Sequence, residues 1–221
     1  MQTPRRTDTP SSSDSIALRP LGRGDLPTVA NIHLRAFPHS ALSKLGHETV
    51  RRYYEWQLLG PHEVVAIGAS SGEVLLGFSL GGVFRGATSG FVRSNRGFLA
   101  RCLLQRPWLL ADPLFRNRAR TGARSLRRSD RGDTSAGAET DAFGILSIAV
   151  DPRHHRSGIG TLIMGEMEQR ARTRKATRMH LSVEPKNSSA ICFYERMGWE
   201  TTERDAGTDR MIKLLQDPDG P

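Results

Sequence analysis

The chain has 221 residues, of which 37% are hydrophobic and 25% charged, and it carries a formal net charge of +9. No apolar run approaches the roughly 20 residues that cross a bilayer, so we expect no membrane span. Two cysteines, Cys102 and Cys192, have no paired spacing; this argues against a disulfide framework, favours a reducing compartment and leads us to expect a cytoplasmic protein.

The N-terminal elements are a polar leader, a strand and two helices. Residues 1–14 lack the apolar centre of a signal peptide and predict a disordered leader. The alternation over 15–19 predicts a strand. Asp25 is placed to cap a helix over 26–37, and a second helical pattern covers 42–58.

The middle of the chain predicts a hairpin, a helix and a loop. Two β-rich runs, 63–70 and 73–83, are separated by the turn residues Ser-Ser-Gly. Residues 91–110 predict a helix that ends at Pro107. The following segment, 116–140, has no apolar period and predicts a mobile loop.

Most of the excess positive charge lies between residues 101 and 131, which hold nine arginines and two aspartates, a net charge of +7. Such charge favours the binding of anions, but it does not distinguish nucleic acid, anionic lipid and a phosphorylated small molecule. The arginines have no interleaved aromatic residues, so only unspecific phosphate contact is open to them. We favour a solvated loop and expect neither a nucleic-acid nor a membrane partner.

The C-terminal part alternates strands and helices. The expected elements are a strand at 143–150, a helix at 158–174, a strand at 179–184, a helix at 188–197, and strand-like pieces at 199–204 and 210–215. The chain is therefore predicted to be α/β with one sheet. We expect one domain over 15–216, with a helical and Arg-rich insert at about 91–140 and a tail at 217–221.

The segment LSIAVDPRHHRSGIGTLIM predicts an anion site, because an apolar strand leads through a glycine-containing loop into a helix. The first amides of that helix lack internal partners, and Gly158 and Gly160 permit close approach. A pyrophosphate is the natural ligand. Ile163 occupies the position of the third Rossmann glycine, and no Gly-Lys-Ser/Thr triplet follows, so both nucleotide fingerprints are weakened.

Two motifs in this order resemble the GNAT superfamily of acetyl-CoA-dependent N-acyltransferases. The loop motif V-x-P-x-x-[QR]-x-x-G-x-G is matched by Val150, Pro152, Gly158 and Gly160. The second, N-x-x-A-x-x-F-Y-x-x-x-G-[FW], is matched by Asn187, Ala190, Phe193, Tyr194, Gly198 and Trp199. The chain departs from the first motif at His155, where the family has Gln or Arg, and at Arg156, where glycine is common.

The resemblance implies a single mixed, mostly antiparallel central sheet of about six to seven strands flanked by helices and splayed between the fourth and fifth strands. It also implies acetyl-CoA as cosubstrate and no metal, in keeping with the lack of metal-ligand spacing among the histidines. The implied cofactor-binding residues are Ile148, Ala149, Val150, His155, Arg156, Ser157, Gly158, Ile159, Gly160, Thr161, Asn187 and Tyr194.

The resemblance implies that Tyr194 is the general acid that protonates the departing thiolate, since a phenol with a pKa near 10 can hold a proton for a thiol. Packing as a core aromatic is its alternative. Glu184, at a strand end, is a candidate proton acceptor for the amine, or a surface charge. Asn187 either orients the cofactor or caps the following helix.

The expected reaction is direct acetyl transfer to a primary amine, with Phe37, His39 and Tyr53 on the acceptor side. The acceptor is predicted to be a small molecule such as an amino sugar, with a protein or peptide amine as the alternative. An alternative of another class is a catalytically weak scaffold that binds nucleic acid or an anionic surface through the Arg-rich insert. A homodimer is left open.

Overall fold

The computed structural model describes residues 15–84, 87–112, 115–116, 142–205 and 207–215. The predicted leader (1–14), the predicted tail (217–221) and most of the Arg-rich insert lie outside these residues. No helix within them is long and apolar enough to cross a membrane.

One seven-stranded sheet organises the described chain, in the order β1-β2-β3-β4-β5-β7-β6. Its pairs are antiparallel except β4 with β5, which are parallel. The strands are β1 Ile16–Pro20, β2 Glu63–Ser71, β3 Val74–Val83, β4 Ala142–Val150, β5 Arg178–Val183, β6 Glu200–Asp205 and β7 Thr208–Leu214. The predicted mixed, mostly antiparallel sheet is confirmed, including the hairpin of β2 and β3.

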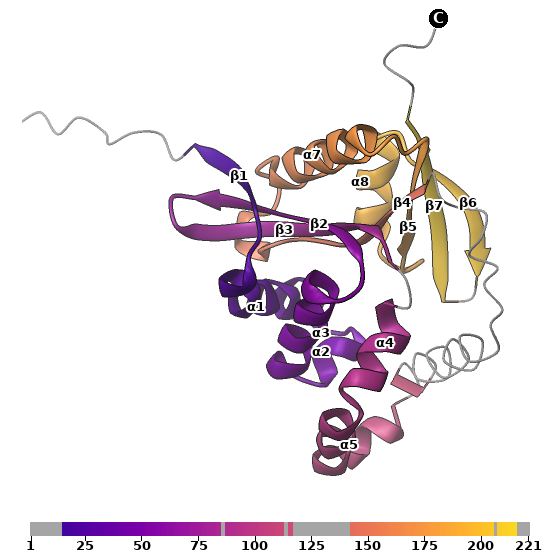
Figure 1. The fold of residues 1–221 in the computed structure, drawn as a ribbon. Helices are drawn as coiled ribbons and strands as arrows, with labels where there is room; N and C mark the ends of the chain where they lie inside the picture. The colour runs from indigo at the N-terminus through magenta and orange to yellow at the C-terminus, as the bar shows by residue number, and fades with distance from the viewer. Residues whose placement is uncertain (1–14, 85–86, 113–114, 117–141, 206, 216–221) are drawn as a thin grey trace, which may run out of the picture.

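Helices cover both faces of the sheet (Figure 1). α7 and α8 pack on one face, here called the α7 face, while α1 and α3 pack on the other, the α1 face. α4 packs on α3 and is followed by α5, away from the sheet. The helices are α1 Leu26–Ala36, α2 Ala41–Lys44, α3 His47–Leu59, α4 Ala87–Ser94, α5 Arg96–Gln105, α7 Ile159–Thr173 and α8 Ser188–Arg196, with 3-10 turns η1 Arg23–Asp25, η2 Pro107–Leu110 and η3 Pro152–His154.

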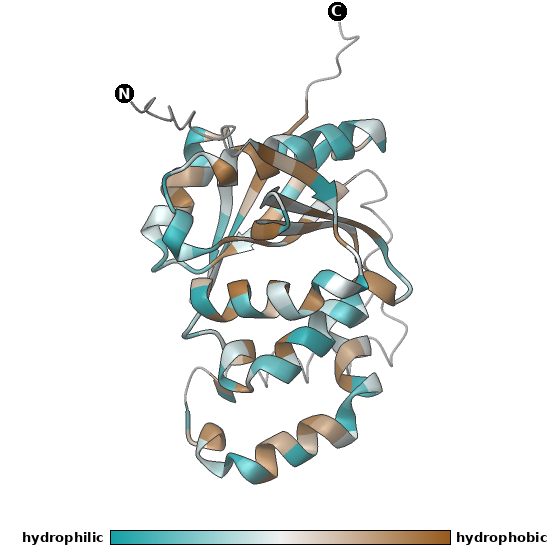
Figure 2. Cartoon of the chain, turned by 90° about the vertical axis from the view of Figure 1, so that its left-hand side faces the viewer, coloured by the Kyte–Doolittle hydropathy of each residue, from teal (hydrophilic) through white to brown (hydrophobic). Residues whose placement is uncertain are grey.

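The sheet separates two apolar cores, because successive side chains of a strand point to opposite faces. On the α7 face, Ile67 and Phe143 pack with methionines of α7. On the α1 face, Ala66 and Phe78 pack with α1 and α3. In Figure 2 the brown, apolar ribbon of the sheet lies between helical layers of mixed hydropathy, as expected for amphipathic helices.

β4 carries the two irregularities that shape the candidate site. Leu80 pairs with Ser147 and Gly81 with Ile145, so Leu146 is an extra, bulged residue. The parallel pairing with β5 starts at Ala142 and ends at Ile145. Beyond the bulge, the described part of β4 diverges from β5. The predicted splay between the fourth and fifth strands is confirmed.

Three local predictions needed correction. Asp25 precedes α1, but its carboxylate accepts from the amide of Gly22 and from Arg19 instead of capping α1, because these donors lie on its other side. The helix predicted over 91–110 is two helices with Asn95 between them. The pattern over 42–58 is likewise divided into α2 and α3 at Gly46, whose φ of 93° does not continue a helix.

Candidate active site

The second half of β4 presents backbone groups to the gap beside β5. The Asp151 amide donates to the Leu76 carbonyl (2.8 Å), and Ser79 Oγ donates to the Ser147 carbonyl (3.0 Å). Odd positions from 147 to 151 therefore face β3. Because backbone groups alternate between the two edges of a strand, those of Ile148 and Val150 face the gap. Ala149 directs its backbone to β3 and its side chain into the α1-face core.

A buried carboxylate holds the loop that follows β4. Asp151 is 2% exposed and accepts from the Arg153 amide (3.1 Å) and from Arg153 Nη2 (2.8 Å). Arg35 of α1 donates to the same carboxylate. The hydrogen bond from Arg153 holds the pKa of Asp151 well below its usual range, assisted by the positive charge of Arg35. The loop is thus tied both to its own backbone and to α1.

The loop exposes its middle residues and then starts α7. His155 is extended, whereas Arg156 has a φ of 64° and Gly158 one of 79°. Ser157 Oγ donates to the His154 carbonyl (2.6 Å). The amides of the first turn, which includes the predicted residues Ile159, Gly160 and Thr161, have no acceptor within the helix.

The space above these amides fits a phosphate group. A Cβ built on Gly158 would meet no atom within 4 Å, whereas one on Gly160 would make ordinary contacts with Phe193 (3.6 Å) and Val150 (3.9 Å). Gly158 therefore leaves open space at the positive end of a 15-residue helix. Together with the gap beside β4, this loop fits a ligand with a pyrophosphate and a polar arm.

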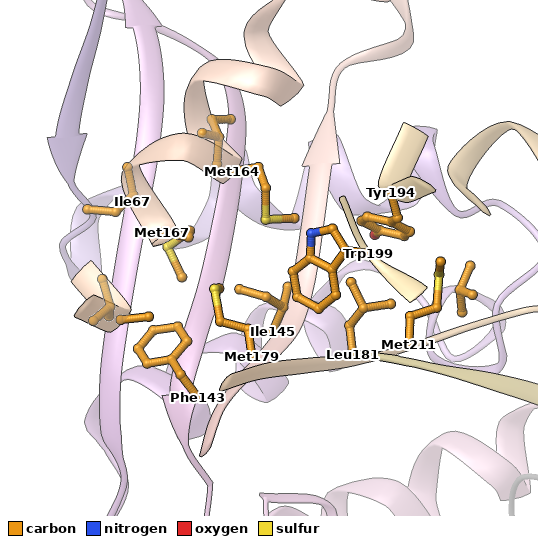
Figure 3. Packing of buried hydrophobic residues seen from close by; sticks show 14 of the residues in the cluster. Ile67, Phe143, Ile145, Met164, Met167, Met179, Leu181, Tyr194, Trp199 and Met211 are labelled. Atoms are coloured by element: carbon orange, nitrogen blue, oxygen red, sulfur yellow. The ribbon is translucent and has the colours of Figure 1, made fainter. Parts of the chain in front are cut away.

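Tyr194 packs in the core on the α7 face of the sheet. Its ring is 9% exposed and packs against Phe193 and Trp199, with Leu181 close by in Figure 3. Burial raises the pKa of Tyr194 to about 12, so the phenol stays protonated through the physiological range. Its packing agrees with the core-aromatic interpretation, and its protonation state also suits a proton donor.

Asn187 and Glu184 flank the end of β5. Asn187 Oδ1 accepts from the Ala190 amide at 3.2 Å, so this side chain caps α8. Glu184 directly follows β5, and its side chain is exposed. The structure thus gives Asn187 the capping contact and leaves the role of Glu184 as a prediction.

Two of the three predicted acceptor residues share one aromatic cluster on the α1 face. Phe37 packs edge-on against His33, with ring centroids 5.0 Å apart. Tyr53 packs edge-on against Tyr54 (5.5 Å). His39, by contrast, is exposed in the turn between α1 and α2.

Sequence reasoning missed two polar interactions near the site. One is the hydrogen bond from Arg35 to Asp151. The other is a buried hydrogen-bonded set of His33, Tyr54 and Ser147. His33 stands at an apolar position of the helical pattern, so local periodicity predicts it only as a core residue. No sequence motif marks partners so far apart in the chain.

The α/β fold thus combines a bulged strand that diverges from its parallel neighbour with a loop and a helix whose first amides have no acceptor within the helix. Residues 122–199 match the family model described as "Acetyltransferase (GNAT) family". Over this part of the chain the sequence is thus similar to the GNAT acetyltransferases. No curated protein sequence matches the chain significantly.

Solved structures share this fold at low sequence identity. A PaiA N-acetyltransferase from Thermoplasma acidophilum in complex with coenzyme A is 14% identical, with a TM-score of 0.57 over 90% of this chain and 99% of that one. The ribosomal-protein-S18-alanine N-acetyltransferase of Escherichia coli is 15% identical (TM-score 0.55, 91% and 95%). YncA of Salmonella typhimurium, a putative acetyltransferase with its cofactor acetyl-CoA, is 16% identical (0.53, 93% and 97%).

Proposed function

We propose that this protein transfers the acetyl group of acetyl-CoA directly to a primary amine. The observation that carries the proposal is the divergence of β4 from β5 beyond Ile145, next to a loop that ends in the open amides of α7. A ligand with a pyrophosphate and an amide-containing arm satisfies both features at once. The solved relatives whose printed titles name coenzyme A or acetyl-CoA share this fold and support the proposal.

Each group of residues along the gap has a separate proposed role. The amides of the first turn of α7 bind the pyrophosphate, assisted by Arg156 and, when protonated, His155. The backbone groups of Ile148 and Val150 bind the arm. Bound acetyl-CoA supplies the reactive thioester. Tyr194 then donates a proton to sulfur as the C–S bond breaks, and Glu184 accepts a proton from the incoming ammonium, directly or through water.

The acceptor side favours a small amine. Tyr53 packs against Phe91 of α4 with ring centroids 5.3 Å apart, so an additional helix adjoins a residue that we propose lies on the acceptor side. With α4 at this place, a folded protein acceptor has less room to approach than it would on an open surface. The acceptor we propose is a small molecule such as an amino sugar, and a protein or peptide amine is the competing class, in line with the printed name of the Escherichia coli relative.

Two measurements test the proposal. Acetyl-CoA should raise the unfolding midpoint of the purified protein, because a ligand that binds only the native state stabilises it by mass action. Free thiol release should then be screened with amino sugars, polyamines, amino acids and N-terminal peptides as acceptors. An unchanged midpoint at millimolar acetyl-CoA, together with no heat of binding, contradicts the cofactor assignment.

A matched variant separates specific binding from general effects. Gly160→Val should weaken acetyl-CoA binding, since a branched side chain there would crowd the start of α7 next to Phe193 and Val150. Gly165→Val, on the same helix with open space around its Cβ, should bind acetyl-CoA like the parent. If small amines give no thiol release and N-terminal peptides do, the acceptor class is peptide and the small-molecule assignment is wrong.

A further inference from the structure

Three polar side chains form a connected set on the α1 face of the sheet. His33 Nδ1 lies 2.8 Å from the Tyr54 hydroxyl, which donates to Ser147 Oγ at 2.9 Å. His33 is 7% exposed and Tyr54 fully buried, and the Tyr54 ring packs edge-on against Phe78. Burying polar groups of this kind in an apolar core costs free energy unless they form hydrogen bonds with one another. Ser147, where the set ends, is half-buried.

The hydrogen bonds have a direction. A hydroxyl carries one hydrogen, and that of Tyr54 is given to Ser147. With that direction, the Tyr54 oxygen accepts from His33, and the ring carries its hydrogen on Nδ1. Nε2 then carries no hydrogen; Ser40 Oγ lies 3.4 Å from it but gives its own hydrogen to Ser43 Oγ, so no hydrogen bond joins Ser40 and Nε2 in this arrangement. At the far end, the hydrogen of Ser147 is available for a third partner.

If the hydrogen bonds ran in the opposite direction, the set would carry the proton of the acceptor ammonium from Ser147 through Tyr54 to His33. Burial lowers the pKa of His33 to about 4. An alkyl ammonium has a pKa near that of lysine, about 10.4, so transfer to His33 is unfavourable by a factor of about 10⁶. The geometry and this difference both favour a set that donates a hydrogen bond at Ser147.

Ser147 stands where the acetyl group is expected. It directly follows the bulged Leu146 and precedes Ile148, whose backbone faces the gap. An arm that runs from the loop along Val150 and Ile148 ends beside Ser147. Tyr194 packs in the α7-face core and Ser147 bonds to Tyr54 on the α1 face, so the two hydroxyl residues lie on opposite faces of the sheet.

We propose that Ser147 donates a hydrogen bond to the thioester carbonyl oxygen of acetyl-CoA, and that Tyr54 and His33 position its hydroxyl. This inference rests on the proposed function. When the neutral amine attacks the carbonyl carbon, the C–N bond forms and the electron pair of the C=O bond moves to oxygen, where Ser147 stabilises it. The pair then returns, the C–S bond breaks and sulfur takes a proton from Tyr194. The extra proton of nitrogen passes through water to the tyrosinate, which restores the phenol.

Two experiments on the full-length protein test the assignment. The first needs no acceptor: isotope-edited infrared difference spectra of [1-¹³C]acetyl-CoA bound to the protein report the thioester carbonyl stretch. A hydrogen bond lowers this frequency, so the band should move to higher wavenumber in Ser147→Ala and part of the way in Tyr54→Phe. Ser147→Thr keeps the hydroxyl and should restore the band of the parent.

The second experiment measures turnover with the best amine from the thiol-release screen. Ser147→Ala should lower kcat roughly 10- to 100-fold, near the lower end for loss of an oxyanion donor, while the affinity for acetyl-CoA stays within a few fold. The double variant with Tyr54→Phe should be no slower than Ser147→Ala, because Tyr54 acts only through Ser147.

Ser79→Ala is the matched control. Ser79 is buried and donates to the backbone carbonyl of the same residue, Ser147, from the neighbouring strand. Its loss should lower the unfolding midpoint and leave the carbonyl band and kcat near those of the parent.

The outcomes separate this inference from the proposed function. If acetyl-CoA binds to the parent, Ser147→Ala and Ser79→Ala and its carbonyl band has the same frequency in all three, the inference alone is overturned. Equal kcat values in an active parent and Ser147→Ala do the same. No binding of acetyl-CoA to the parent overturns the proposed function and the inference with it.

Discussion

Arg35 and Asp151 form an ion pair across 116 positions of the chain, between the last turn of α1 and the end of β4. The pair connects α1 to the loop that we propose binds pyrophosphate. Because the carboxylate also accepts from the Arg153 amide, a change at Asp151 affects both elements.

Asp151→Asn should therefore destabilise the fold and weaken acetyl-CoA binding. The amide keeps the shape of the side chain and loses its charge-assisted bonds, which predicts a loss of about 1–3 kcal/mol in the free energy of unfolding by urea denaturation at pH 7. Asp25→Asn is the control, because the Arg19–Asp25 pair is more exposed and should cost less than about 1 kcal/mol. Equal losses for the two variants contradict a special role of Asp151.

The two glycines of the proposed phosphate loop should respond differently to alanine. Gly158 has a φ of 79°, so Gly158→Ala strains the backbone and should cost about 1–2 kcal/mol of stability. Gly160 lies inside α7, where alanine is the better helix former, and its Cβ would make an ordinary contact with Phe193. Gly160→Ala should thus be as stable as the parent or more so. Thermal melts without ligand decide the comparison, and a reversed order would show that the loop conformation has been misassigned.

Replacing Tyr194 by Phe isolates its hydroxyl. The ring contacts with Phe193 and Trp199 remain, so the unfolding midpoint and the affinity for acetyl-CoA should stay near the parent values. If the phenol protonates the leaving thiolate, kcat should fall roughly 10- to 1000-fold. Turnover at the parent rate from pH 6 to pH 9 would show that Tyr194 serves packing alone.

Acid should destabilise the protein through His33. Its pKa is lowered from 6.5 to about 4 because burial disfavours the charged ring. Between these values the unfolded chain binds more protons, so the free energy of unfolding decreases as pH falls through this window. From pH 7 to pH 4.5 we expect a loss of about 2–3 kcal/mol from this residue.

His33→Gln removes that titration and should make the free energy of unfolding less dependent on pH between 7 and 4.5. Urea denaturation of both proteins at the two pH values measures the difference. The pKa of Asp151 is depressed, so its contribution to stability is lost only below the usual aspartate range and does not enter this window. Equal losses in parent and variant would contradict the buried, neutral state of His33.

The sequence predicted those features that local patterns encode. Alternation and helical spacing located the strands and most helices, and the spacing of Gly158 and Gly160 after an apolar strand located the loop. The role of Asp25 was mispredicted because Arg19 and the Gly22 amide compete for its carboxylate. Such competition depends on the path of the backbone, which spacing does not describe.

Contacts between distant segments were not predictable in this way. Tyr54 meets Ser147 across 93 positions only because α3 packs on the face to which β4 directs that serine. The bulge at Leu146 decides which face Ser147 takes, and no residue type there signals an extra position. The proposed roles of Glu184, His39 and the insert stay predictions.

The short pairing of β4 with β5 has a consequence for the motions of the protein. Four residue pairs join β5, β7 and β6 to the other four strands of the described sheet, so few backbone hydrogen bonds hold the two halves of the sheet together along β4 and β5. A ligand arm in the gap would add hydrogen bonds along β4 and contacts to β5. We expect bound acetyl-CoA to slow hydrogen–deuterium exchange along β5.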